Sequence, residues 1–301
     1  MAILQRDPQS NKGSHGALAI VGGATGTVGA ACLSSRAALY AGTGRVFMVR
    51  PTAGDGFLLD PLAPEVMVIS FMQALQKPIT AWVLGPGLGT SDAAHQIMAS
   101  ILGAEVPVLI DADGLNLMAE DPALGRQCAR RTAATICTPH PGEAARLMGV
   151  SVAEIQSARA QWAQKIAEKF NAITVLKGAG SVITQPLANQ PENPENAPRS
   201  AARSARASET PLQTSLGATT TLPVINDTGN AALATAGTGD VLSGLIGALL
   251  AQGMDPQKAA ITGTRIHGLA AQALTQTIGG MVGVTSSELI PEIRRLMNSL
   301  N

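Results

Sequence analysis

The chain has 301 residues, of which 46% are hydrophobic and 14% charged, and its 21 basic and 21 acidic residues cancel. This balance argues against nucleic acid or an anionic membrane as a partner. The longest apolar run is far shorter than the roughly 20 residues that cross a bilayer, and the polar N-terminus does not resemble a signal peptide. Three scattered cysteines argue against a disulfide framework or a zinc site. We therefore expect a soluble cytoplasmic protein.

Short apolar runs alternate with helical patterns along most of the chain. Each expected strand opens one of the segments 17–23, 45–49, 81–89, 107–116, 134–143 and 172–180. Most of these segments end in glycine or acidic residues. Alternation of this kind predicts an α/β fold with a mainly parallel sheet and helices on both faces. Ligands in such folds bind at the carboxyl ends of the strands, where these loops lie.

One segment departs from this pattern. Residues 185–222 are rich in Pro, Asn, Ser, Ala and Thr and have almost no large apolar side chains. Burial cannot offset the entropy of ordering such a segment, so we expect a mobile insert. The flanking sequences SVITQP and LPVIND are expected to be two strands of the hairpin that the insert interrupts. Residues 13–301 are then one domain, preceded by a flexible N-terminus, residues 1–12.

The sequence ATAGTGD, followed by the apolar run VLSGLIGALLAQG, predicts an anion site. Small residues at Gly237, Thr238 and Gly239 let consecutive N–H groups face one concavity, and a helix expected from residue 241 adds the positive end of its dipole. The run is apolar nearly all round, so we expect a buried helix that holds its tip rigidly. Asp240, at the threshold of the helix, should be ionised at neutral pH and could accept a proton. Alternatively, Asp240 only caps the helix.

Several blocks, in one order, resemble the NAD(P)H-hydrate dehydratases, a metabolite-repair family of the ribokinase-like superfamily. The resemblance covers roughly residues 13–297 and includes GNAALATAGTGDVLSG around the anion site. The other blocks are GGATGTVGA (22–30), GPGLG (85–89), IDADGLN (110–116), TPHPGE (138–143), LKGAGSVI (176–183), HGLAAQ (267–272) and GVTSSELIPEI (283–293).

The resemblance implies a ribokinase-like three-layer α/β/α fold with a mainly parallel central sheet. It also implies a reaction that uses ADP or ATP, with Mg²⁺, to restore NADH and NADPH from the (6S) hydrates NADHX and NADPHX. The hydrate hydroxyl is phosphorylated and phosphate is then eliminated. Family members are expected to be homotetramers. The epimerase domain often fused to this one is not found in the sequence, so a separate NAD(P)H-hydrate epimerase is expected to act alongside.

The resemblance also assigns roles to residues. Gly237, Thr238 and Gly239 form the anion hole for the phosphoryl group, and Asp240 is the base that also contacts the substrate. The adenine nucleotide is expected to contact Gly239 and the residues Lys177, Gly178, Ala179, Gly180 and Ser181. For the KGAGS segment alone, an ordinary turn after a strand remains the alternative.

The resemblance points to substrate contacts at Ala30, Gly89 and His140. It makes Glu143 a candidate magnesium ligand, because HPGE has the spacing of the N-x-x-E motif of ribokinase-like kinases. Glu143 can equally stabilise the first turn of a helix, and Gly89 can serve a tight turn.

Three further residues are open to two interpretations. Asp111 and Asp113 stand at an expected strand end, where they can contact magnesium or sugar hydroxyls, or cap the next helix. His267 is expected to serve packing rather than chemistry.

Three other functions compete with the dehydratase. A ribokinase-like kinase for a small alcohol would use the same anion hole and Asp240, but TPHPGE and KGAGS favour the dehydratase. A nicotinamide dehydrogenase would read GGATGTVGA as a dinucleotide loop, whose spacing does not fit G-x-G-x-x-G. A non-catalytic adenine-nucleotide sensor would not need Asp240 and His140.

Overall fold

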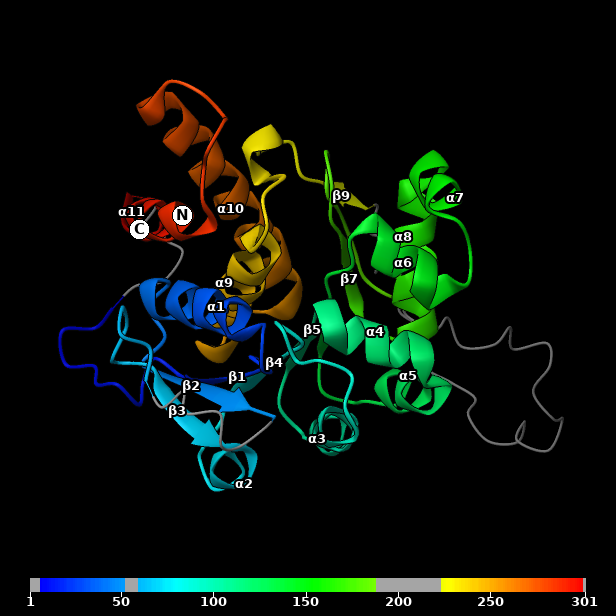
Figure 1. The fold of residues 1–301 in the computed structure, drawn as a ribbon, viewed down its shortest axis with the longest axis horizontal. Coiled ribbons are helices and arrows are strands. Elements are labelled where there is room, and N and C mark those ends of the chain that lie inside the picture. Colours follow the sequence, from blue (N-terminus) through cyan, green and yellow to red (C-terminus); the bar gives the residue numbers. More distant parts are fainter. Residues whose placement is uncertain (1–5, 52–58, 188–222, 300–301) are drawn as a thin grey trace, which may run out of the picture.

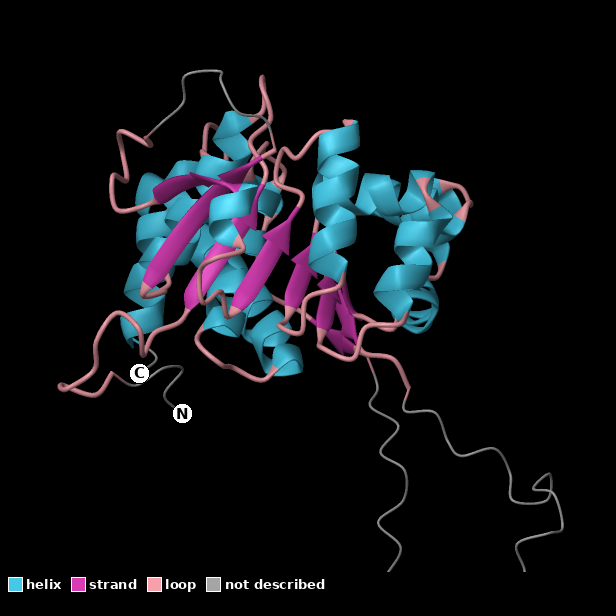
Figure 2. Ribbon diagram, turned by 90° about the horizontal axis from the view of Figure 1, so that it is seen from below, coloured by secondary structure: helices cyan, strands magenta, loops and turns pink. Residues whose placement is uncertain are grey.

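The structure, a computed structural model, describes residues 6–51, 59–187 and 223–299. Over these ranges one mixed sheet runs through the molecule in the order β3-β2-β1-β4-β5-β6-β7-β8-β9 (Figure 2). The strands are β1 Ala17–Val21, β2 Arg45–Arg50, β3 Met67–Ser70, β4 Ala81–Leu84, β5 Val108–Ile110, β6 Thr135–Cys137, β7 Ile173–Leu176, β8 Val182–Thr184 and β9 Val224–Ile225. All pairings among strands β1 to β7 are parallel, whereas β8 is antiparallel to β7 and β9. The predicted mainly parallel sheet is therefore confirmed.

Helices cover both faces of the sheet. They are α1 Val28–Tyr40, α2 Phe71–Ala74, α3 Asp92–Leu102, α4 Ala112–Glu120, α5 Pro122–Ala129, α6 Pro141–Met148, α7 Val152–Ser157, α8 Arg159–Phe170, α9 Thr238–Ala251, α10 Pro256–Ile278 and α11 Ser286–Ser299, with a short 3-10 turn at Ala231–Leu233. Figure 1 shows α1, α9, α10 and α11 gathered on one side and α4 to α8 on the other. None of the described helices is long and apolar enough to span a bilayer.

The alternation of side chains along each strand builds two cores. In β1, Leu18 and Ile20 face the core shared with α1, α9, α10 and α11. Ala17, Ala19 and Val21 face the core shared with α3, α4, α5, α6 and α8. Because both faces of the strand are covered, its sequence is apolar throughout rather than alternating. The result is the expected three-layer α/β/α arrangement.

Helix α9 is buried over almost its whole length, as its sequence predicts. Its glycines allow two close approaches. A Cβ at Gly244 would lie 2.0 Å from the carbonyl oxygen of Ser34 in α1, and a Cβ at Gly247 would lie 2.4 Å from Val83 in β4. The helix is thus wedged between α1 and the sheet, and its first turn is held firmly at the carboxyl edge of the strands.

The predicted hairpin around the insert is confirmed, since β8 pairs with β9 through Val182–Ile225 and Ile183–Val224. The insert itself lies outside the described residues from 188 to 222. At the N-terminus, residues 1–5 also lie outside them, while Arg6 donates a hydrogen bond to the carbonyl of Gly42. The flexibility expected of residues 1–12 stays a prediction.

Candidate active site

Four neighbouring strands bring the motif loops together at one edge of the sheet. GPGLG follows β4, DADGLN follows β5, TPHPGE follows β6 and KGAGS follows β7, and these strands are adjacent in the sheet. The first two loops touch directly. A Cβ at Gly85, which has φ +123°, would lie 1.7 Å from the carbonyl oxygen of Asp111, so only glycine fits there. Motifs far apart in the sequence thus form one continuous rim.

The GTGD segment closes this rim from the other side of the sheet. Helix α9 begins at Thr238 rather than at the expected residue 241, and Gly237 is its N-cap with φ 87°. Asp240 is therefore the third residue of the helix. The alternative that Asp240 caps the helix is wrong, because the N-cap is a glycine and the cap has no side-chain hydrogen bond.

The free hydrogen-bond donors at the start of α9 are main-chain N–H groups rather than the hydroxyl of Thr238. The Thr238 hydroxyl lies within hydrogen-bond distance of the carbonyls of Leu233 (2.8 Å) and Thr235 (3.0 Å), so it is turned away from the rim. Within the described ranges, the N–H groups of Gly239 and Asp240 donate to no protein acceptor. Two free N–H groups at the positive end of α9 suit a phosphoryl group.

The surroundings of Asp240 bring its pKa close to neutrality. Burial, helped by the negative charges of Asp111 and Asp113 and opposed by Lys177, raises the pKa to about 6. The dipole of α9 favours the charged form but does not outweigh the burial. Asp240 still carries its charge at pH 7 in most molecules. A carboxylate with this pKa can both take up and release a proton near neutral pH.

Lys177 links three of the motif loops. Its ammonium Nζ lies 2.6 Å from Oδ1 of Asp111 and 3.8 Å from Oε2 of Glu143. A Cβ at Gly239 would lie only 3.3 Å from the same Nζ. Burial works against the charge of Lys177, but Asp111, Glu143 and Asp240 together raise its pKa. Lys177 is therefore charged, and its ammonium lies at the start of α9 rather than in the KGAGS loop from which it comes.

Asp111 is held on both oxygens. Besides the ion pair on Oδ1, its Oδ2 accepts a hydrogen bond from the hydroxyl of Ser243 at 2.5 Å. Asp111 occupies the N-cap position of α4, but its side chain makes no cap hydrogen bond. The next residue, Ala112, has φ +46°, which costs energy for any residue with a Cβ. This turn aims Asp111 at the site, so capping is not the role of its side chain.

His140 and Glu143 form a capping box at the start of α6. His140 Nδ1 accepts hydrogen bonds from the N–H groups of Gly142 and Glu143, and the His140 N–H donates to Oε2 of Glu143 at 2.7 Å. Burial, together with Lys177 and Arg146, lowers the pKa of His140, so the ring is neutral at pH 7. The histidine side chain is half exposed at the rim. It is thus available to a ligand.

Glu143 is buried, and the effect of burial on its pKa outweighs that of the nearby positive charges. Burial raises its pKa to about 7, Lys177 opposes the shift and Asp111 adds to it. The expected role in the first turn of the helix is confirmed by the capping box. A magnesium role stays a prediction, since the described residues contain no group of three or more His, Cys, Asp or Glu placed to hold a metal.

Asp113 and Gly89 bind each other. Oδ2 of Asp113 accepts a hydrogen bond from the N–H of Gly89 at 2.8 Å, and its Oδ1 accepts one from Asn116. Asp113 therefore fixes the GPGLG loop and does not cap α4. The N–H of Gly89 is already used, so a substrate contact at Gly89 would involve its Cα or carbonyl.

The KGAGS loop is supported by Arg159, a residue that the sequence analysis missed. Its guanidinium Nη2 lies 3.0 Å from the carbonyl of Leu176, 3.4 Å from that of Lys177 and 3.3 Å from that of Gly180. Gly178 and Ala179 at the tip of the loop are exposed, while Ser181 donates to the carbonyl of Gly178. Arg159 belongs to no recognised motif, so only the folded chain shows this contact.

Two predicted residues lie at the margins of the site. Ala30 is in the first turn of α1, three residues before Leu33, whose side chain packs against Gly237. His267 in α10 is buried, with a pKa lowered to about 4 by burial, and it interacts with the main chain of Thr238. This burial agrees with the packing role expected for His267.

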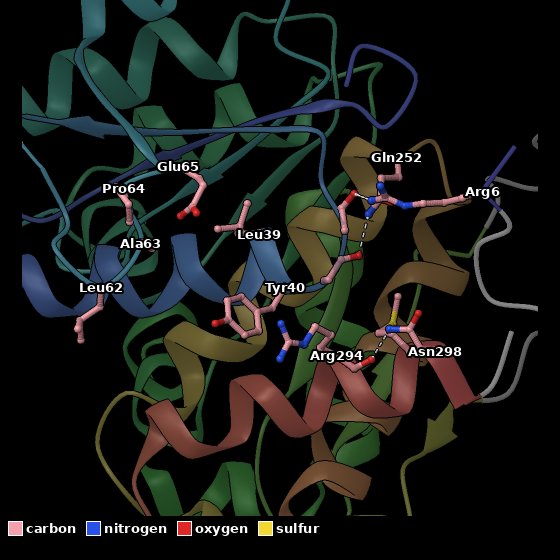
Figure 3. A pocket seen from close by; sticks show the side chains of 13 residues that line it. Arg6, Leu39, Tyr40, Leu62, Ala63, Pro64, Glu65, Gln252, Arg294 and Asn298 are labelled. Atoms are coloured by element: carbon pink, nitrogen blue, oxygen red, sulfur yellow. Dashed lines mark hydrogen bonds between the residues drawn. The ribbon is translucent and has the colours of Figure 1, made fainter. Parts of the chain in front are cut away.

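A separate cavity lies at the other end of α9. It has a volume of about 840 Å³ and is lined by Arg6, Leu39, Tyr40, Ala41, Gly42, Leu62, Ala63, Pro64, Glu65, Gln252, Arg294, Met297 and Asn298. Figure 3 shows Tyr40 and Arg294 side by side there, with the guanidinium 4.6 Å from the ring centre. Gln252 follows the C-terminus of α9, whereas Asp240 is in its first turn. The cavity is therefore not part of the rim.

The model of the NAD(P)H-hydrate dehydratase family matches residues 18–203 and 218–295. An ADP-dependent (S)-NAD(P)H-hydrate dehydratase of Neisseria meningitidis is 37% identical, over 98% of this chain and 89% of the relative. A bifunctional NAD(P)H-hydrate repair enzyme of Escherichia coli is 36% identical over 98% of this chain, which spans 50% of that longer relative.

Solved structures agree with these matches. The ADP/ATP-dependent NAD(P)H-hydrate dehydratase of Bacillus subtilis, co-crystallised with ATP and Mg²⁺, superimposes with a TM-score of 0.77 at 28% identity, covering 99% of this chain and 94% of that one. A ribokinase-like superfamily protein of Enterococcus faecalis, with a TM-score of 0.73 at 24% identity over 98% and 91% of the two chains, confirms the fold class. The chain belongs to the NAD(P)H-hydrate dehydratase family.

Proposed function

We propose that this protein dehydrates the (6S) hydrates NADHX and NADPHX back to NADH and NADPH, using ADP or ATP. One observation carries the proposal. Asp240, with a pKa near neutrality, and the two free N–H groups of Gly239 and Asp240 meet the ammonium of Lys177 at the tip of a rigid helix. This arrangement suits transfer of a phosphoryl group to a hydroxyl.

In this proposal Asp240 accepts the proton of the hydrate hydroxyl as that oxygen attacks the terminal phosphorus of the nucleotide. The N–H groups of Gly239 and Asp240 bind the phosphoryl oxygens, whose negative charge they stabilise. The phosphate formed on the substrate then leaves with the electrons of its carbon–oxygen bond. The neighbouring ring carbon gives up a proton to water, and the electrons of that carbon–hydrogen bond restore the double bond of the dihydropyridine. The exposed Gly178 and Ala179 let the nucleotide approach the main chain, and His140, Gly89 and Ala30 face the hydrate.

The chemistry of the acidic residues fits a magnesium ion. Glu143 and Asp111 are two buried carboxylates, and the ammonium of Lys177 pairs with both of them. Magnesium is usually bound by one or two carboxylates together with substrate phosphates. When bound, it would neutralise charge on the nucleotide phosphates. We therefore propose Glu143, with Asp111 behind it, as the magnesium side of the site.

We further propose a cytoplasmic homotetramer that acts alongside an NAD(P)H-hydrate epimerase. The support for the epimerase is stereochemical, because a dehydratase specific for the (6S) hydrate leaves the (6R) hydrate unrepaired. Size-exclusion chromatography with light scattering tests the tetramer.

Product analysis tests the reaction. Purified protein is incubated with (6S)-NADHX, Mg²⁺ and either ADP or ATP, and the products are separated by chromatography. The proposal predicts NADH together with inorganic phosphate and the nucleotide shortened by one phosphate. Accumulation of a phosphorylated hydrate without NADH would instead indicate a kinase.

A further inference from the structure

Ser243 is a buried polar residue for which the proposed reaction gives no direct role. It lies in the second turn of α9 and is fully buried. Its hydroxyl is 2.5 Å from Oδ2 of Asp111 and 3.0 Å from the carbonyl oxygen of Gly239. One hydroxyl thus faces both the acid of the DADGLN loop and the main chain of the anion site.

Asp111, which Ser243 holds through Oδ2, also binds Lys177. Its other oxygen, Oδ1, holds the Lys177 ammonium at 2.6 Å. The side chain of lysine has a flexible stem of four carbons, so its ammonium stays in one place only where hydrogen-bond or ion-pair partners fix it. The hydrogen bond from Ser243 orients the carboxylate of Asp111. The orientation of this carboxylate in turn determines the position of the Lys177 ammonium.

The ammonium of Lys177 lies at the N-terminal turn of α9. The ammonium lies where a Cβ at Gly239 would be 3.3 Å away, next to the free N–H groups of Gly239 and Asp240. A positive charge here adds to the two N–H dipoles. The ammonium therefore lies at the start of α9 and not at the exposed tip of the KGAGS loop, Gly178 and Ala179.

We propose that Ser243 is a positioning residue that, through Asp111, holds the ammonium of Lys177 beside Gly239, where Lys177 contacts the transferred phosphoryl group. This inference rests on the proposed function. It assigns the charge of Lys177 to phosphoryl transfer rather than to nucleotide affinity. Loss of Ser243 should therefore lower kcat and leave nucleotide binding unchanged.

A double-mutant cycle tests the proposal. Ser243→Ala is expected to lower kcat about tenfold, as removal of supporting hydrogen bonds typically does, with the Kd for ADP unchanged. In the Lys177→Met background the same substitution should have no further effect on kcat, because Ser243 acts through Lys177. Ser243→Cys, whose thiol is a weak donor, should fall between serine and alanine. Additive losses in the cycle would overturn the proposal.

Two further measurements separate this proposal from its premises. Ser35→Ala is the matched control, since Ser35 is also fully buried and its hydroxyl has no hydrogen-bond partner within the described residues; its kcat should equal that of the wild type. A crystal structure of Ser243→Ala should show the Lys177 ammonium displaced from Gly239. An unmoved ammonium would overturn the positioning role, whereas a wild type without dehydratase activity would sink only the proposed function.

Discussion

The ammonium of Lys177 and the backbone of Gly239 are in contact although 62 residues separate them in the sequence: a Cβ at position 239 would lie 3.3 Å from Nζ of Lys177. The contact joins the loop after β7 to the first turn of α9. It places one positive charge beside the two N–H groups that are free to bind an anion.

This contact predicts that Gly239→Ala is harmful to catalysis but not to folding. Gly239 does not have a positive φ, and alanine favours helix, so the thermal midpoint should not fall. The added methyl group displaces the Lys177 ammonium by a few tenths of an ångström. We expect kcat to fall about two- to tenfold, since a misplacement of about 1 Å at a reacting centre costs about 100-fold. Steady-state kinetics together with calorimetry check both parts, and a variant with wild-type kcat would contradict the account.

The pKa of Asp240 predicts the acid limb of the pH profile. Burial raises this pKa to about 6, so below pH 6 the carboxyl is protonated and cannot accept a proton. The kcat/KM for the hydrate in the free enzyme should fall about tenfold per pH unit there. Asp240→Asn should lower kcat by about 10²- to 10⁴-fold and remove this limb. A limb that persists in the variant would assign the titration to another group.

Substitution of Glu143 is expected to stabilise the protein, and this gain should depend on pH. Its pKa is raised by burial from 4.5 to about 7, so the folded protein binds a proton that the unfolded chain has lost between these values. The ionised carboxylate therefore lowers stability, fully above pH 7 and not at all below about pH 4.5. Without Mg²⁺, Glu143→Gln should raise the thermal midpoint at pH 8 and not at pH 4.5.

A matched control for this variant is Glu154→Gln. Glu154 is also the glutamate of a capping box, in α7, but it is fully exposed and its pKa is lowered by hydrogen bonds from Ser151. Its substitution should not stabilise the protein at pH 8. Equal gains in the two variants would show that the burial of Glu143 is not the cause.

Substitution of Arg159 is expected to change the KM for the nucleotide and not the KM for the hydrate. Its guanidinium holds the carbonyls of Leu176, Lys177 and Gly180, so Arg159→Met should loosen the KGAGS loop. We expect the KM for ADP to rise about tenfold and the KM for the hydrate to stay unchanged. Arg159→Lys should be intermediate, because one ammonium cannot reproduce the fork geometry. A rise in both KM values would point to general damage; Arg295→Met, on the exposed face of α11, is the control.

Much of the fold could be predicted because both faces of the sheet are covered. The buried strands are apolar throughout, and the glycine and acidic loops mark their ends. The edge strand Met67–Ser70 escaped prediction, since it has only four residues and none of them is buried. The start of α9 was placed three residues late, because glycine and threonine are poor helix formers and the helix there is stabilised by tertiary packing.

The residues of the candidate site were predictable from the sequence only where they belong to a motif. GTGD, TPHPGE and KGAGS marked loops that the fold brings to one edge of the sheet, but not the contacts between these loops. The ion pair of Lys177 with Asp111 spans 66 residues, and Ser243 is separated from Asp111 by 132. Such pairs follow from the order of the strands in the sheet. The raised pKa of Asp240 likewise depends on burial and on Asp111, neither of which its local sequence reveals.

The most direct test of the account compares wild type with Asp240→Asn on (6S)-NADHX, with Mg²⁺ and saturating ADP, by following the absorbance of NADH. The account predicts a nucleotide-dependent rise with the wild type and almost none with the variant, although both bind ADP with the same Kd. A rise of equal rate in the two proteins would show that the reaction does not take place at the start of α9.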